Sequence, residues 1–236
     1  MRRTMRSATA HCTKINNIGQ GRVRAWLECE IPLAPGQFAL TTATSDQYLS
    51  TALFPVEIEK QGFVIEIAPG PEDRSSFLVK PGDTIDILGP VGQAISALTP
   101  DKNVLLFGTY NPQVLLPFAT QALKQECSVT LALTQPYPVE ILDPNIEVRM
   151  GKLPQLLNDL SDWADQVFVQ SDDETLAYLS QYTQEWDSGS YALISPTMPC
   201  GTGACQACAI LSSKGWRLTC IDGPMFKLAD LSHRAT

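Results

Sequence analysis

The sequence has little histidine, few positive charges and no long hydrophobic run. Only two histidines, His11 and His233, occur among 236 residues, so a histidine-rich metal site or a Ser/His/Asp triad has little material to use. Seventeen Lys and Arg against 25 Asp and Glu give a net charge of −8, the wrong sign for holding a phosphate backbone. We therefore expect neither a triad hydrolase nor a nucleic-acid partner.

The most apolar stretch, residues 104–119, is too short and too polar for a membrane span. It is interrupted by four residues: Asn111, Pro112, Gln113 and Pro117. The basic segment 1–6 is followed by polar residues, where a secretory signal would place its apolar stretch. These features predict a cytoplasmic protein with no membrane association.

The residues that are present favour a folded chain of short elements. The hydrophobic share of 44% is enough to build a core, and 17 prolines with 15 glycines predict many turns. Residues 22–31, 63–67 and 84–88 alternate between apolar and polar side chains, a pattern typical of half-buried strands. Short strands separated by turns predict an antiparallel β barrel over residues 1–98.

Between residues 99 and 195 the pattern changes to alternating strands and helices. Asn111 can cap the first of these helices, and Pro112 suits its first turn. Alternation of this kind predicts an α/β domain with a parallel sheet. The strands are expected at 104–107, 128–133, 166–170 and 191–194, and the helices after Asn111 and at 153–160 and 172–186.

The tail, residues 196–236, forms a third and smaller module that is rich in cysteine and glycine. Its cysteines have the spacing C-x4-C-x2-C, with a fourth after eleven further residues, which is the spacing of plant-type [2Fe-2S] ligation. The expected ligands are Cys200, Cys205, Cys208 and Cys220. A structural zinc site is the alternative, although zinc sites usually have two C-x2-C pairs and only one is present here. Cys12, Cys29 and Cys127 are expected to be small core residues.

Several motifs together resemble the electron-transfer subunit of the heterotetrameric dihydroorotate dehydrogenases, within the ferredoxin reductase superfamily. The most characteristic is the ending Cys-x-Asp-Gly-Pro-x-Phe, and the barrel motifs Pro-Gly-Gln-Phe and Pro-Gly-Asp also match. They occupy residues 220–226, 35–38 and 81–83.

The resemblance implies a cofactor relay used in pyrimidine biosynthesis. FAD lies between barrel and α/β domain and exchanges electrons with NAD, and the iron–sulfur cluster passes them to FMN in a separate catalytic subunit. The partner it implies is therefore this FMN-containing dehydrogenase subunit, or another flavoprotein. The FAD-binding positions that the resemblance implies are Pro55, Val56, Glu57, Arg74, Ser75 and Ser76.

The sequence departs from this family twice. Where the family has Arg-Pro-x-Ser, with arginine on the FAD phosphates, this chain has Phe54-Pro55-Val56-Glu57, so a cation is lost and an anion gained. Arg74 is a possible substitute, and FAD binding stays open. The family's glycine-rich turn is reduced to residues 108–112 with one glycine, so NAD is not expected to bind.

Two functions remain. The chain is either an electron-transfer component rather than a complete enzyme, or a degenerate reductase that acts as a binding or regulatory module with a structural metal. A redox-inert metal such as zinc would favour the module. Four intact ligand positions favour electron transfer.

Overall fold

The computed structural model describes residues 5–41, 50–67, 79–95, 98–109, 111–182, 186 and 189–231. The chain divides into two compact units, and the tail contributes to both of them. The first unit comprises Met1–Ala94, Ser195–Cys208 and Leu218–Pro224, and the second comprises Ile95–Ile194, Ala209–Arg217 and Met225–Thr236. The division into three domains at residues 98 and 195 stays a prediction.

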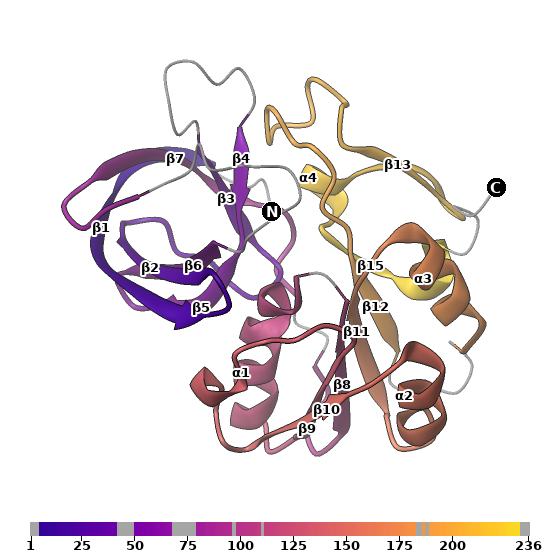
Figure 1. Ribbon diagram of the computed structural model, residues 1–236. Helices are drawn as coiled ribbons and strands as arrows, with labels where there is room; N and C mark the ends of the chain where they lie inside the picture. Colours follow the sequence, from indigo (N-terminus) through magenta and orange to yellow (C-terminus); the bar gives the residue numbers. More distant parts are fainter. Residues whose placement is uncertain are drawn as a thin grey trace. The chain divides into compact units, whose positions relative to one another are not determined.

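The first unit is built on a seven-stranded antiparallel sheet in the order β4-β3-β7-β1-β2-β6-β5 (Figure 1). The edge strands β4 and β5 are joined by the single residue Phe54, so the sheet curls until its two edges nearly meet. The predicted barrel is confirmed. Its strands are β1 (Arg6–Gly19), β2 (Arg22–Glu28), β3 (Phe38–Thr41), β4 (Thr51–Leu53), β5 (Pro55–Glu59), β6 (Gly62–Ile67) and β7 (Thr84–Val91).

The barrel core contains the apolar residues of the predicted alternation. Ala25 and Leu27 of β2 pack with Phe63 and Ile65 of β6, because these strands pair antiparallel with Ala25 opposite Ile65. The strand predicted over 22–31 ends at Glu28, and Ile31 still reaches the core. Burial of charged side chains on the same strand, described below, was not predicted.

The second unit contains a six-stranded sheet in the order β10-β9-β8-β11-β12-β15. Its first five strands are parallel and β15 is antiparallel to β12, so the predicted parallel sheet is confirmed except at one edge. The strands are β8 (Asn103–Gly108), β9 (Ser128–Leu133), β10 (Ile146–Met150), β11 (Gln166–Gln170), β12 (Ser190–Leu193) and β15 (Met225–Lys227). Strands β10 and β15 were not predicted.

The helices of this unit follow the predicted positions with one difference in length. α1 spans Leu116–Lys124 and α2 spans Leu153–Leu160, whereas α3 spans only Asp173–Leu179 and continues as a 3-10 turn, Ser180–Tyr182. Asp172 caps α3 through its carboxylate, which accepts from the amide of Thr175 at 2.8 Å. No helix within the described ranges is long and apolar enough to cross a membrane.

The remaining elements are short. They are the 3-10 turns Pro112–Leu115, Val139–Ile141 and Leu228–Leu231, the hairpin strands β13 (Ala209–Ser212) and β14 (Gly215–Leu218), and helix α4 (Thr219–Asp222).

Replacing Phe168 with alanine tests the core of the α/β unit. Phe168 is fully buried on β11 and stacks on Phe118 at 5.0 Å and on Tyr191 at 5.5 Å. We expect Phe168→Ala to lower the free energy of unfolding by about 3–5 kcal/mol, because it removes apolar contacts and leaves a cavity. In chemical denaturation the exposed Met150→Ala should change stability by less than about 0.5 kcal/mol. Equal losses would contradict this core.

Candidate functional site

The four tail cysteines lie in two segments of the first unit. Cys200, Cys205 and Cys208 belong to the loop between β12 and β13, and Cys220 lies on the short helix α4. Cys208 and Cys220 are buried, with sulfur atoms 3.3 Å apart, too far for the 2.05 Å of a disulfide. Cys200 is half-buried and Cys205 is exposed. The sites predicted from spacing alone are therefore brought to one end of the barrel unit.

The loop conformation depends on glycine at two positions. Gly201 and Gly203 have φ values of +65° and +80°, a region that other residues rarely adopt. A Cβ atom on Gly201 would lie 2.7 Å from Leu40 Cδ1, and one on Gly203 would lie 3.0 Å from Ile221 Cγ1. The loop can pass this close to β3 at Gly201 and to α4 at Gly203 only because these side chains are absent.

Hydrogen bonds hold the two cysteine segments together. The amide and the hydroxyl of Thr219 both donate to the carbonyl oxygen of Cys208, at 3.1 Å each. The amide of Gly92, directly after β7, donates to the carbonyl oxygen of Cys220 at 3.1 Å. Cys220 is thus fixed against both the loop and the barrel.

An apolar group of the barrel lies against the buried cysteines. We call it the barrel-end group, and Phe54 packs on it, with its ring 4.8 Å from that of Phe38. The residue that replaces the family's arginine is therefore part of the packing around the cysteines. The barrel-end group consists of Phe38, Leu40, Val91 and Met198, which pack with Cys208 and Cys220.

The thiols differ in acidity. Burial, followed by hydrogen bonding and charge interaction with Cys208, raises the pKa of Cys220 to about 12. Burial also acts to raise the pKa of Cys200, but hydrogen bonds from Thr202 and Cys205 outweigh it and lower this pKa to about 6. Cys200 therefore loses its proton more readily than an ordinary thiol, and the thiolate is the form that binds metals, whereas Cys220 would release its proton as a metal binds.

The arrangement in pairs distinguishes the possible metals. Among the described residues, no three His, Cys, Asp or Glu side chains gather closely enough to hold one metal ion. The cysteines instead form two pairs, Cys200 with Cys205 and Cys208 with Cys220. A single zinc takes four ligands, but in a [2Fe-2S] cluster each iron takes two protein ligands. The residues present fit the two-iron cluster better.

The implied FAD positions fall partly on β5 and partly outside the described residues. Pro55 and Val56 are buried, and Glu57 is partly exposed. Arg74, Ser75 and Ser76 lie outside the described residues. Glu57 accepts from Arg24 Nη1 at 2.7 Å, so its charge has a partner within the barrel unit.

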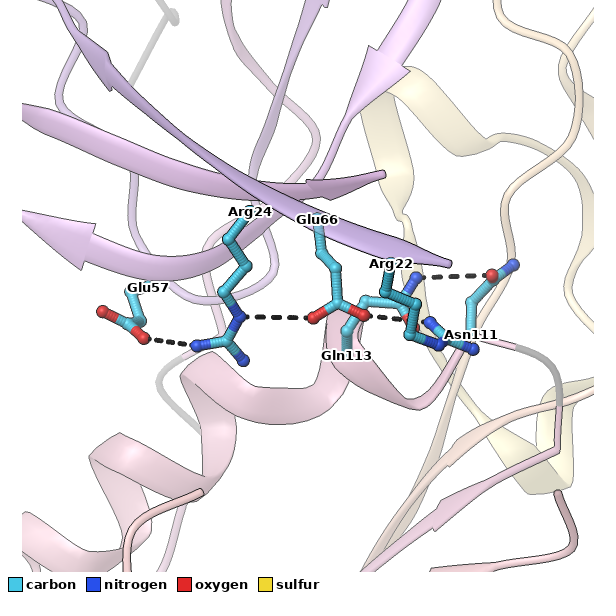
Figure 2. A network of polar contacts seen from close by, with 6 residues as sticks. All are labelled: Arg22, Arg24, Glu57, Glu66, Asn111 and Gln113. Atoms are coloured by element: carbon cyan, nitrogen blue, oxygen red, sulfur yellow. Dashed lines mark hydrogen bonds and ion pairs between the residues drawn. The ribbon is translucent and has the colours of Figure 1, made fainter. Parts of the chain in front are cut away.

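This ion pair belongs to a larger network, shown in Figure 2. Glu66, whose side chain is 0% exposed, accepts from Arg24 Nε at 3.3 Å and from Arg22 Nη1 at 2.9 Å. Arg22 and Arg24 are only 9% and 4% exposed. Sequence reasoning missed all three residues, because the alternation on β2 assigned its arginines to solvent. The signal that could have identified them is a second alternating strand carrying an acid, but only the register places Arg24 opposite Glu66.

The backbone amides of the turn after β8 are hydrogen-bonded to the end of β11. The amide of Thr109 donates to the carbonyl of Gln170 at 3.0 Å, and the amide of Asn111 donates to the Gln170 side chain at 2.8 Å. In sheets of this order ligands bind at the carboxyl ends of the two strands, β8 and β11, where the strand order reverses. Two amides that could face a phosphate there are engaged with Gln170.

The expected cap at Asn111 is wrong. The chain enters a 3-10 turn at Pro112 before α1, and Asn111 makes no capping hydrogen bond. Its side-chain oxygen instead accepts from Gln113 Nε2 at 3.3 Å (Figure 2). A helix beginning with a 3-10 turn lacks the first α-helical turn that the cap would serve.

Comparison with known proteins supports these observations. Residues 195–232 match the family model described as the iron-sulfur cluster binding domain of dihydroorotate dehydrogenase B. The relatives are dihydroorotate dehydrogenase B (NAD(+)) electron transfer subunits. That of Geobacillus sp. is 25% identical over 84% of this chain and 86% of its own length, and that of Desulforamulus reducens is 25% identical over 62% and 65%.

Solved structures agree on the fold. One match is the structure of an NADH-dependent reduced ferredoxin-NADP oxidoreductase, a protein studied for flavin-based electron bifurcation. Its TM-score is 0.77 at 20% sequence identity, and the match covers 94% of this chain and 88% of that chain. The ferredoxin reductase of carbazole 1,9a-dioxygenase has a TM-score of 0.60 at 16% identity, covering 75% and 64%.

The fold and the cysteine site together define a class, proteins with a ferredoxin-reductase-like fold and an added iron–sulfur domain. The expectation of such a domain in the tail is confirmed. More particularly, the segment 195–232 matches the iron–sulfur domain of dihydroorotate dehydrogenase B, and the resemblance of the chain to the electron-transfer subunits of that enzyme is confirmed.

Replacing Gly201 with alanine tests the close approach of the cysteine loop to the barrel. Gly201→Ala and Gly82→Ala both place a side chain at positive φ, which costs about 1–2 kcal/mol. Only Gly201→Ala also meets Leu40, since the space around Gly82 is open within 4 Å. We expect reduced iron content and visible absorbance for Gly201→Ala after anaerobic purification, and unchanged values for Gly82→Ala. Normal iron in Gly201→Ala would contradict this packing.

Proposed function

We propose that the chain is an electron-transfer subunit that carries a [2Fe-2S] cluster and passes electrons between a flavin and a partner flavoprotein. The ligands are Cys200, Cys205, Cys208 and Cys220. The observation that carries the proposal is the arrangement of these four thiols in two pairs, within a segment that matches an iron–sulfur domain family.

The surroundings of the two cysteine pairs suit the transfer of single electrons. When bound, a plant-type cluster supplies one-electron chemistry at about −400 mV. Cys208 and Cys220 lie against the barrel-end group, which excludes water from one side of the site. Cys205 is exposed, so the site would be accessible to a redox partner at this cysteine. Burial and amide hydrogen bonds to sulfur are the means by which a protein tunes the potential.

FAD is the second cofactor of the proposal. Pro55, Val56 and Glu57 on β5 contribute to its site, together with Arg74, Ser75 and Ser76 by resemblance. The structure answers one objection to this assignment, since the charge of Glu57 is balanced by Arg24. We propose no NAD site, because the turn after β8 has lost the glycines that such a site uses.

The partner we propose is an FMN-containing dihydroorotate dehydrogenase catalytic subunit. Support comes from the relatives, which are electron transfer subunits of dihydroorotate dehydrogenase B. An electron-transfer subunit without a catalytic partner would have no substrate to oxidise. The same pairing would place this chain in pyrimidine biosynthesis.

The test is the visible spectrum of anaerobically purified protein, with iron, zinc and acid-released flavin measured on one sample. We expect about two irons per chain, as a [2Fe-2S] cluster requires, and bound FAD. Cluster without flavin would restrict the chain to a one-cofactor conduit. One zinc per chain and no iron would overturn electron transfer and leave the alternative, a binding or regulatory module with a structural metal.

Replacing Cys205 with serine tests the ligand assignment. We expect Cys205→Ser to lose most of the visible absorbance, because it removes one sulfur ligand of the cluster while the exposed position tolerates serine in the fold. Cys29→Ser, a half-buried cysteine of the barrel, is the control and should keep the full spectrum. An unchanged spectrum for Cys205→Ser would exclude Cys205 as a ligand.

A further inference from the structure

The barrel carries a buried ionic network that the proposed electron transfer does not explain. Its two arginines and two glutamates are Arg22, Arg24, Glu57 and Glu66 (Figure 2). The formal charges cancel. Ionic groups withdrawn from water are costly unless they are well paired, and in some proteins they are kept for a specific role.

The four members are held unequally. Glu66 is completely buried and bridges both guanidinium groups, so it is the fixed anchor of the network. Glu57 stands at the rim, with its side chain 46% exposed, and its carboxylate contacts Arg24 Nη1 at 2.7 Å. Water screens an ion pair in which one member is this exposed, so the pair contributes little to stability. Glu57 is therefore the member that another anion can most easily replace.

Glu57 also lies in the stretch that the resemblance assigns to FAD binding. It is the last residue of the stretch Phe54-Pro55-Val56-Glu57, where the resemblance implies FAD contacts, and Phe54 is turned into the packing on Phe38. Arg24 on β2 contacts the Glu57 side chain on β5, so a different strand places a cation beside this stretch.

We propose that Glu57 is an exchangeable counter-ion and that Arg24 binds a phosphoryl oxygen of FAD when Glu57 moves away. This inference rests on the proposed function, because it concerns FAD. A guanidinium group that contacts a carboxylate at 2.7 Å has the geometry to bind a phosphate oxygen in the same way. With Glu57 displaced, Arg22, Arg24 and Glu66 carry a net positive charge, which favours the doubly charged pyrophosphate.

Glu57→Gln is the informative variant, because it removes the competing charge at a partly exposed position. We expect it to bind FAD about tenfold more tightly, equivalent to about 1.4 kcal/mol. Arg24→Gln should weaken FAD binding at least tenfold, and Arg24→Lys should give an intermediate affinity, because it keeps the charge but loses the planar fork. The iron–sulfur spectrum of each variant verifies folding independently of flavin.

The dissociation constants are measured by quenching of flavin fluorescence. Glu147→Gln and Arg149→Gln remove an exposed ion pair of 2.6 Å on β10 and should leave the FAD affinity unchanged. Riboflavin, which has no phosphate, should not distinguish Glu57→Gln from the unmodified protein. An equal gain for riboflavin would assign Arg24 to the flavin ring and overturn the phosphate contact.

The outcomes separate this inference from the proposed function. If the unmodified protein binds FAD and both Glu57→Gln and Arg24→Gln bind it equally well, the counter-ion role is wrong and the FAD assignment stands. If only Glu57→Gln binds FAD, the counter-ion role is supported. If neither the unmodified protein nor Glu57→Gln binds FAD although the cluster is present, both the FAD assignment and this inference are overturned.

Discussion

The hydrogen bonds from Thr219 to the carbonyl oxygen of Cys208 join the two segments that carry the four cysteines of the proposed metal site. Three of the cysteines come from one loop and the fourth from a helix that follows a hairpin, and without this junction Cys208 and Cys220 would not form a pair. Thr219 is completely buried, so both of its donors need a protein acceptor. These hydrogen bonds hold the backbone of Cys208 beside the residue that precedes Cys220.

The barrel contributes the surface against which this junction is held. Gly92 donates to Cys220, and the side chains of Leu40 and Val91 lie where a side chain on Gly201 would be. Strands β3 and β7 of the barrel therefore contribute to the burial of Cys208 and Cys220. Phe54 has a double effect, since it joins the two edge strands and packs against Phe38 of the barrel-end group.

The charged side chains of the barrel also depend on their neighbours. Glu57 alone would oppose an anionic cofactor, but the structure pairs it with Arg24, and Glu66 holds Arg24 in turn. A glutamate at position 57 would weaken the binding of an anion if it stood alone. Its charge is neutralised here by the ion pair with Arg24. The net effect on a bound flavin depends on which anion Arg24 contacts, and this is a question of relative affinities.

The sequence by itself determined the barrel, the parallel sheet and the iron–sulfur domain, because period-two alternation, strand–helix alternation and cysteine spacing are local patterns. It also located Cys200, Cys205, Cys208 and Cys220 as a set. Only the tertiary structure decided that they form two pairs, that β15 closes the second sheet antiparallel, and that Asn111 does not cap a helix. It alone showed the buried partners Arg24 and Glu66, which are 42 residues apart in the chain. Contacts of this kind depend on strand register, and register is set by the packing of the whole sheet rather than by neighbouring residues.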